Sequence, residues 1–218
     1  MAKIIDLSLP LTDGAPSYPK DPPLRIEFYR RLPEDGCNVT QITMGTHQGT
    51  HCDAPFHFLK EGRPIDQVPL ERFYGPATLV DLAPNAELPP KTPITPDMLQ
   101  PFAKYFREGS RVICRTGWYR HFGQPDYFTD LPSLTVEAAQ WIAARRISLL
   151  GIDMPTPSKI AGREVHQILL APGAEIVLVE ALTNLDALPQ DFIFAGFPLK
   201  LVGRDGSPIR AVAIIPDE

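Results

Sequence analysis

The chain has 218 residues, of which 44% are hydrophobic, which is enough apolar material for a single globular domain spanning residues 1–218. Its formal net charge of -5 and the absence of a basic run argue against nucleic acid and anionic membrane surfaces as partners. No stretch approaches the roughly 18 apolar residues of a membrane span, and the first residues lack the apolar core of a signal peptide.

Nine short segments rich in Ile, Val, Leu or Phe, each bounded by Gly, Pro, Asn or Asp, are predicted strands. In chain order they cover residues 3–9, 24–31, 39–44, 77–82, 111–115, 147–153, 175–182, 192–201 and 211–215. Helices are predicted over 66–73, over 95–109 with Thr95 as N-cap and a kink or later start at Pro101, and from Thr135 to about residue 146. Short elements suit the 25 prolines, and the pattern predicts a strand-dominated α/β domain of undetermined topology.

The three cysteines, Cys37, Cys52 and Cys114, are odd in number, widely spaced and free of any CxxC pair. This argues against a disulfide framework and against a thiolate zinc site. We expect unreactive thiols in a reducing cytoplasm, and therefore a cytoplasmic protein.

Three of the five histidines lie within eleven residues, and an aspartate lies among them: His47, His51, Asp53 and His57. All four are at odd positions, so in an extended chain their side chains share one face. A helix is disfavoured by the glycine, threonine, aspartate and proline in the segment. We expect a strand end that runs into a loop, with Cys52 turned to the opposite face.

Imidazole nitrogen and carboxylate oxygen are ligands that Zn²⁺, Mn²⁺ and Fe²⁺ accept. Three such ligands, from His47, His51 and Asp53, leave positions open for water and substrate, and a bound divalent ion lowers the pKa of its water from ~15.7 to as low as ~7. His57 is a candidate general acid or base, since imidazole titrates near neutrality. The structural alternative, in which histidines cap turns, suits one histidine better than four clustered groups.

A second group is His166, before an apolar run, and Glu180 at the end of that run. A glutamate at the end of a buried strand is costly unless it is paired or binds a cation. Metal binding by this pair competes evenly with a surface histidine and an ordinary strand-end glutamate. Asp153, at another strand end, is explained equally well by a functional role and by the turn that follows it.

The twelve residues HQGTHCDAPFHF, from His47 to Phe58, closely resemble the HxGTHxDxPxHF signature of the metal-dependent cyclase-like family. That family includes bacterial kynurenine formamidase and isatin hydrolase. Supporting segments extend over nearly the whole chain: 18–21, 115–118, 150–153, 179–185, 197–200 and 205–208. The resemblance implies a swivelling β/β/α domain, a homodimer or larger homo-oligomer, and hydrolysis of a small amide.

The resemblance also implies a ligand set for one or two zinc ions, with manganese as the alternative metal. His47, His51 and Asp53 would bind the first ion. Asp53, His166 and Glu180 would bind the second, and His57 would carry the proton. The spacing from His166 to Glu180 is about two residues longer than the formamidase pattern, so Glu175 is a competing ligand.

The resemblance also bears on which residue contacts the substrate. The formamidases carry a tryptophan in an aromatic-Pro-Gly-Asp turn, where this chain has Tyr18-Pro19-Lys20-Asp21. Tyr18 can stack on an aryl group, but lysine in place of glycine predicts a changed turn. N-formylkynurenine is therefore one candidate substrate among aryl formamides.

The sequence is consistent with three functions. The first is formamidase-like hydrolysis, in which metal-bound hydroxide attacks the carbonyl and His57 protonates the leaving amine. The second is ring opening of an isatin-like cyclic amide at the same site. The third is a metal-binding module without catalysis, against which His57 argues because a passive site needs no proton carrier.

Overall fold

The computed structural model describes residues 2–216 and is built on one nine-stranded, curled sheet. Its strands follow the order β1-β13-β11-β5-β7-β9-β10-β4-β12. Their bounds are β1 Lys3–Asp6, β4 His51–Asp53, β5 Tyr74–Asp81, β7 Arg111–Arg115, β9 Leu149–Ile152, β10 Val177–Glu180, β11 Asp191–Ala195, β12 Gly206–Pro208 and β13 Val212–Ile215. The prediction of a strand-dominated α/β fold with few helices is confirmed.

The remaining strands form two small sheets, β2 Arg25–Arg30 with β3 Val39–Thr43 and β6 Pro93–Ile94 with β8 Ser133–Leu134. The helices are α1 Pro96–Leu99, α2 Val136–Ala143 and α3 Gly162–Leu170. Short 3₁₀ turns cover Pro55–His57, Ile65–Gln67, Leu70–Phe73, Gln100–Tyr105, Trp118–His121 and Leu185–Ala187. Within the described residues, no helix is long and apolar enough to cross a membrane.

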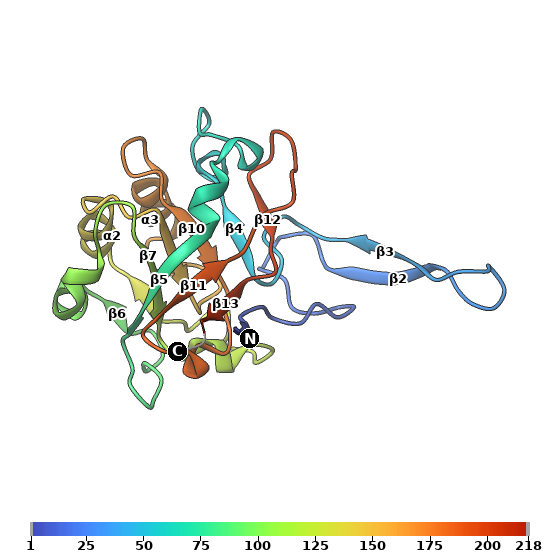
Figure 1. Cartoon of the computed structure of the whole chain (residues 1–218), viewed down its shortest axis with the longest axis horizontal. Coiled ribbons are helices and arrows are strands. Elements are labelled where there is room, and N and C mark those ends of the chain that lie inside the picture. Colours follow the sequence, from blue (N-terminus) through green and yellow to red (C-terminus); the bar gives the residue numbers. More distant parts are fainter. Residues whose placement is uncertain (1, 217–218) are drawn as a thin grey trace.

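Each face of the main sheet carries its own apolar core. In β7, Val112 and Cys114 pack with the helices α2 and α3, whereas Ile113 between them packs into the second core. This alternation follows from the period of two along a strand. The helices cover one face, and the second core lies inside the curl of the sheet (Figure 1). Burial on both faces fixes the register of the central strands.

Each of the nine predicted strands overlaps a strand of the structure, but the predictions for two helices were wrong. The helix predicted over 95–109 is one α-turn, α1, followed by a 3₁₀ segment, because Pro101 has no N–H to continue the α-helical pattern. The helix predicted over 66–73 is two 3₁₀ turns. The helix after Thr135 is confirmed: its hydroxyl oxygen accepts a hydrogen bond from the Ala138 N–H at 3.2 Å.

The strand pairing places three distant segments side by side. Strand β4 lies between β10 and β12 and is antiparallel to both. In this register His51 is opposite Glu180, and Asp53 is opposite Gly206. Residues near 50, 180 and 205 therefore meet at one place in the sheet.

Helix α3 was not predicted from the sequence. It contains His166, and its residues Val165 and Leu169 enter the core at the i, i+4 spacing of a helix. The following strand begins at Val177 and not at residue 175, because Glu175 has a left-handed φ of 43° in the connecting turn.

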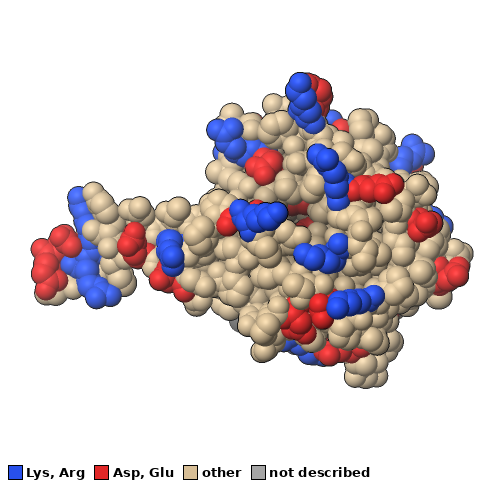
Figure 2. Space-filling model, turned by 180° about the vertical axis from the view of Figure 1, so that it is seen from behind, with Lys and Arg blue, Asp and Glu red and all other residues tan. Residues whose placement is uncertain are grey.

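Strands β2 and β3 form a hairpin that projects well beyond the body of the molecule (Figure 1). Nearly all its residues are exposed, including the large apolar side chains of Phe28, Tyr29, Val39 and Ile42. Charged side chains of both signs gather near its far end, and the body on that side also carries both signs without a patch of one sign (Figure 2).

Candidate metal centre and active site

Strand β4 carries the first two groups of the site. His51 and Asp53 are two residues apart in a strand, so both side chains leave the same face of the sheet. Cys52 leaves the other face and is fully buried in the apolar core inside the curl. Burial, together with the charge of Asp53, raises the pKa of the Cys52 thiol, which fits the expectation of an unreactive thiol.

His47 precedes β4 in a tight turn and contacts two carboxylates. Its Nδ1 lies 2.8 Å from Asp53 Oδ1, and its Nε2 lies 2.7 Å from Asp205 Oδ2. The ring rests on Gly206: a Cβ at that position would lie 2.8 Å from His47 Cε1 and 2.7 Å from the Cys52 carbonyl oxygen. Glycine at 206 therefore allows the imidazole to lie flat against strand β12.

His51 and His166 are oriented in the same way. His51 Nδ1 donates to the Gly49 carbonyl at 2.8 Å, and His166 Nδ1 donates to the Gly162 carbonyl at 2.6 Å. Because a carbonyl oxygen only accepts, each Nδ1 carries a hydrogen. Each Nε2 is thereby left facing the carboxylates of the site, the arrangement in which backbone carbonyls orient metal-binding histidines.

The carboxylates of Asp53 and Glu180 lie between these imidazoles. His51 Nε2 is 3.4 Å from Asp53 Oδ1 and 3.3 Å from Glu180 Oε2. His166 Nε2 is 3.3 Å from Glu180 Oε1 and 3.6 Å from Asp53 Oδ2. Both acids are buried, and Asp53 Oδ2 has no hydrogen-bond partner. An orphaned carboxylate oxygen in such a place is costly unless a cation occupies the centre.

The charges of the site alter its protonation. Burial lowers the pKa of His47, but the carboxylates of Asp53 and Asp205 outweigh it and raise that pKa to about 9. Burial likewise opposes protonation of His51, yet its contacts with Asp53 and Glu180 raise its pKa to about 10. The pKa of Asp53, which burial alone would raise, is held well below its usual value by His47 and His57. Without an ion, this centre binds protons where an ion would bind.

His57 lies beside these groups at the end of the 3₁₀ turn that follows β4. Its ring stacks on that of His47 at 3.8 Å between centroids, and its Nδ1 is 3.6 Å from Asp205 Oδ2. It is more exposed than His47, His51 and His166, with a side-chain exposure of 25%. His57 is thus the imidazole of the cluster most accessible to a substrate.

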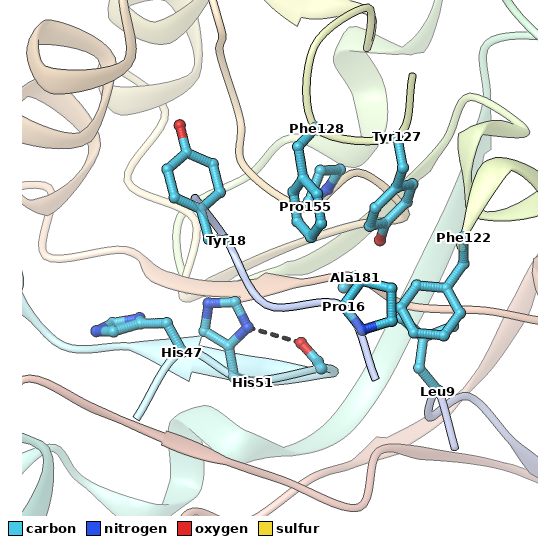
Figure 3. Close-up of a pocket in the computed structure, with 11 residues that line it drawn as sticks. Leu9, Pro16, Tyr18, His47, His51, Phe122, Tyr127, Phe128, Pro155 and Ala181 are labelled. Carbon is cyan, nitrogen blue, oxygen red and sulfur yellow. Dashed lines mark hydrogen bonds between the residues drawn. The ribbon is translucent and has the colours of Figure 1, made fainter. Parts of the chain in front are cut away.

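A cavity of about 280 Å³ opens directly onto these groups. Its wall is made by Tyr18, Asp21, His47, His51, His57, Phe58, Pro155, Thr156, Ser158, Gly162, Arg163, His166 and Glu180. A smaller cavity of about 20 Å³ adjoins it and shares Tyr18, His47, His51 and Pro155 (Figure 3). Volumes of this order suit a small molecule and not a polymer.

Tyr18 lines both cavities, and its ring packs edge-on against Phe128 at 5.7 Å between centroids. Lys20 in the same turn has a left-handed φ of 83°, the conformation that glycine adopts most easily. The Asp21 N–H donates to the Tyr18 carbonyl at 3.0 Å. The lysine therefore occupies a glycine-like turn conformation, where the sequence predicted a changed turn.

Glu175 and Asp153, the two alternative site residues from the sequence, make their contacts outside the histidine cluster. Glu175 pairs with Arg63 at 3.4 Å and with Arg72 at 3.9 Å, and the structure does not bring it to the histidine cluster. Asp153 accepts hydrogen bonds from the Thr116 N–H and hydroxyl and from the Gly117 N–H, so it ties β9 to the loop after β7. Burial raises the pKa of Asp153 to about 6 despite these bonds.

Sequence reasoning missed Asp205 as a member of the cluster. Together with His47 and His57 it forms one of three groups whose potential ligand atoms lie within 4.8 Å of one another. The other two groups are His47 with His51 and Asp53, and Asp53 with His57 and His166. The available signal was the Asp-Gly-Ser-Pro segment at 205–208, which marked the family resemblance but also reads as an ordinary turn.

The chain is similar to known proteins in sequence and in structure. Residues 5–159 match the model of the family described as putative cyclase. The chain is 32% identical over 213 residues to kynurenine formamidase of Bacillus thuringiensis (strain Al Hakam), covering 95% of each protein. It is 31% identical over 215 residues to kynurenine formamidase of Bordetella avium (strain 197N), covering 97% of this chain and 98% of that protein.

Solved structures are also similar to this chain over nearly its whole length. Isatin hydrolase A from Labrenzia aggregata, bound to benzyl benzoate, superposes with a TM-score of 0.87 at 26% identity and covers 99% of this chain and 94% of its own. A potential metal-dependent hydrolase with cyclase activity superposes with a TM-score of 0.82 at 26% identity, with complete coverage of both chains. The family match, the curated relatives and the shared architecture show that this chain belongs to the putative cyclase family.

Proposed function

We propose that the protein is a divalent-metal-dependent hydrolase of a small amide, with an aryl formamide such as N-formylkynurenine as its substrate. The observation that carries the proposal is the convergence of imidazole and carboxylate groups around the unpartnered Asp53 Oδ2, at the wall of the larger cavity. The kynurenine formamidases at 31–32% identity support the substrate class.

The residues present fit a metal centre. In our proposal His47, His51 and Asp53 bind one ion, and Asp53, His166 and Glu180 bind a second, with zinc as the metal and manganese as the alternative. Oxygen and nitrogen donors without thiolate suit either metal.

Asp205 would then orient a ligand without binding the ion itself. It accepts from His47 Nε2 and so leaves His47 Nδ1 directed at Asp53. Carboxylates commonly hold metal-binding imidazoles in this way, and they fix which nitrogen binds the ion.

The chemistry divides between the ion and the chain. A divalent ion held by these residues would supply polarisation of the substrate carbonyl and a lowered pKa of water. His57 takes a proton from the attacking water and delivers it to the leaving amine, since it is the exposed imidazole at the cavity wall. The Asp205 carboxylate lies 3.6 Å from His57 Nδ1 and helps to orient that ring.

Tyr18 is the proposed contact for the aryl group. It is half-buried, lines both cavities and is held by Phe128 from the side. A tyrosine ring positioned in this way offers a flat apolar surface to a flat substrate at little cost in conformational freedom.

A second candidate reaction is the ring opening of an isatin-like cyclic amide. The overlap with isatin hydrolase A at a TM-score of 0.87 favours it, and the same groups would serve it. A panel of formanilides and lactams separates the two reactions: hydrolysis of lactams only would assign the second one.

Metal dependence is tested first. Protein purified without chelator is expected to contain one or two divalent ions per chain by elemental analysis and to lose activity when they are removed. Full activity of metal-free protein would contradict the proposal, and would leave a non-metal hydrolase as the explanation.

We also propose that the chain forms a homodimer through the β2–β3 hairpin. Ile26, Phe28 and Ile42 lie on one face of it, since Ile26 pairs with Ile42 and alternate residues share a face. Phe28 and Ile42 are 54% and 55% exposed, and apolar surface on a projecting arm is stabilised by a second copy. Phe28→Ser combined with Ile42→Ser should shift light-scattering mass from dimer to monomer, whereas a wild-type monomer would contradict the idea.

A further inference from the structure

Tyr127 is held rigidly near the metal centre. Its side chain is fully buried, and its ring packs edge-on against Phe122 at 5.5 Å and against Phe128 at 4.8 Å between centroids. Its carbonyl accepts a hydrogen bond from Trp118 Nε1 at 3.0 Å. The ring therefore cannot swing to bring its hydroxyl to another protein group.

The hydroxyl of Tyr127 has no hydrogen-bond partner. Within residues 2–216 it is one of three buried side-chain atoms in this position, with Asp53 Oδ2 and Asp126 Oδ1. The metal centre accounts for the Asp53 oxygen. A buried hydroxyl without a partner destabilises the folded chain, and phenylalanine would fill the same space without that cost. Within residues 2–216 the Tyr127 oxygen therefore makes no hydrogen bond that would favour tyrosine over phenylalanine.

This hydroxyl is directed into the smaller cavity, toward His51 and Ala181 (Figure 3). The imidazoles of His47 and His51 form one side of that cavity. Its remaining walls are mainly apolar: Leu9, Pro16, Tyr18, Gly49, Phe122, Phe128, Pro155 and Ala181. A polar atom that enters from the larger cavity meets the Tyr127 hydroxyl, whereas the Tyr18 hydroxyl is directed away from His51 and Ala181 (Figure 3).

The volume of the smaller cavity and the charges around it limit which chemical groups can bind there. The cavity of about 20 Å³ has room for one atom of the size of an oxygen or a water molecule. Burial and the nearby charges of Asp153 and Glu180 raise the pKa of Tyr127, so the phenol stays neutral and keeps its hydrogen to donate. The preferred occupant is thus an uncharged oxygen acceptor, since the same burial and charges disfavour an anion.

We propose that the Tyr127 hydroxyl donates a hydrogen bond to a second oxygen of the substrate, one outside the carbonyl that is hydrolysed. Tyr127 is then a specificity-determining residue, and the preferred substrates are amides that carry a keto oxygen near the scissile bond. This inference rests on the proposed amide hydrolysis. A site built to hydrogen-bond such an oxygen discriminates against analogues that lack it, because its own donor is then left unpaired.

The test compares two substrates and two variants of the zinc-loaded protein. Formanilide carries only the scissile carbonyl, whereas 2′-acetylformanilide adds a keto oxygen beside it. Tyr127→Phe should lower kcat/KM for 2′-acetylformanilide by roughly 3- to 10-fold, the worth of one neutral hydrogen bond, and leave formanilide unchanged. Tyr74→Phe is the matched control, because Tyr74 is 49% exposed and lines neither cavity.

Three results would overturn the inference: equal losses on both substrates, no loss on either, or a lower Tm for Tyr127→Phe, which would indicate a structural role. A second readout separates this inference from the proposed function. Binding of the amines 2-aminoacetophenone and aniline is measured by calorimetry without turnover. Wild-type protein should prefer the ketone and Tyr127→Phe should not; equal binding by wild-type protein refutes the role of Tyr127 even if neither formamide is hydrolysed.

Discussion

Replacing Gly206 by alanine tests how the site holds its first histidine. The added Cβ would lie 2.8 Å from His47 Cε1 and 2.7 Å from the Cys52 carbonyl oxygen, about 0.6–0.7 Å inside the 3.4 Å at which ordinary contacts begin. The backbone oxygen belongs to strand β4, which is paired on both sides by β10 and β12 and therefore resists movement. The His47 imidazole must therefore move, although its Nδ1 lies 2.8 Å from Asp53 Oδ1 and its Nε2 lies 2.7 Å from Asp205 Oδ2.

The magnitude follows from these contacts. Overpacking a tight site costs ~1–3 kcal/mol, which for a chain of this length lowers Tm by about 2–12 °C. Displacing His47 also misaligns its Nδ1 from Asp53, and lost orientation of a metal-binding histidine typically weakens metal affinity by ~10- to 100-fold. Gly206→Ala should show both effects together.

Zinc affinity is measured by competition with a chromophoric chelator, and stability by thermal melting of the same samples. Gly162→Ala is the control, because nothing lies within 4 Å of its added Cβ, its φ is not left-handed, and alanine keeps the backbone carbonyl that accepts from His166 Nδ1. That variant should retain wild-type zinc affinity and Tm. Wild-type zinc affinity in Gly206→Ala would show that the ring relaxes freely, and the reasoning from close packing would fail.

The remaining predictions concern protons and substrate. His51→Ala should lose both metal and activity, whereas His57→Ala should keep the metal and lose ~100- to 10,000-fold in rate; loss of metal in both variants would make His57 a ligand. In chelator-treated protein, the pKa values of His47 and His51 are raised to about 9 and 10. The folded state then binds extra protons above pH ~6.5, so Tm should fall as pH rises from ~6.5 toward ~10, and a flat profile would contradict this. Tyr18→Ala should lower kcat/KM for aryl formamides about 2- to 10-fold more than for N-alkyl formamides, and equal losses with a lower Tm would indicate a purely structural role.

Local sequence patterns predicted the elements whose signal is local. The apolar runs are strands in the structure, and the range predicted at 111–115 coincides with β7. Thr135 caps the helix that follows it, as predicted. Extended backbone at His51–Asp53 was predicted, but not as a separate strand β4, because the segment has only three residues and two of them are polar. The strand predicted over 192–201 ends at Ala195, since Gly196 and Pro198 interrupt it.

The candidate site was predictable where its residues are close together in the sequence. His47, His51, Asp53 and His57 form a motif, and their odd spacing indicated a shared face. His166 and Glu180 could be connected to them only through the resemblance, because α3 and β10 reach the site by tertiary packing. Asp205 lies 158 residues from His47, and no periodicity in the sequence relates positions so far apart.

The placement of β4 also governs when the site can exist during synthesis. Both of its neighbours in the sheet, β10 at Val177–Glu180 and β12 at Gly206–Pro208, are made long after His51–Asp53 leaves the ribosome. Until then β4 has neither partner strand, and its buried aspartate has no fold around it. The nascent chain therefore carries the signature motif without the assembled cluster, and the ion that we propose would enter a nearly completed fold rather than nucleate one. Pairings this far apart in sequence also slow folding, so the final step that creates the site is the closure of the C-terminal strands.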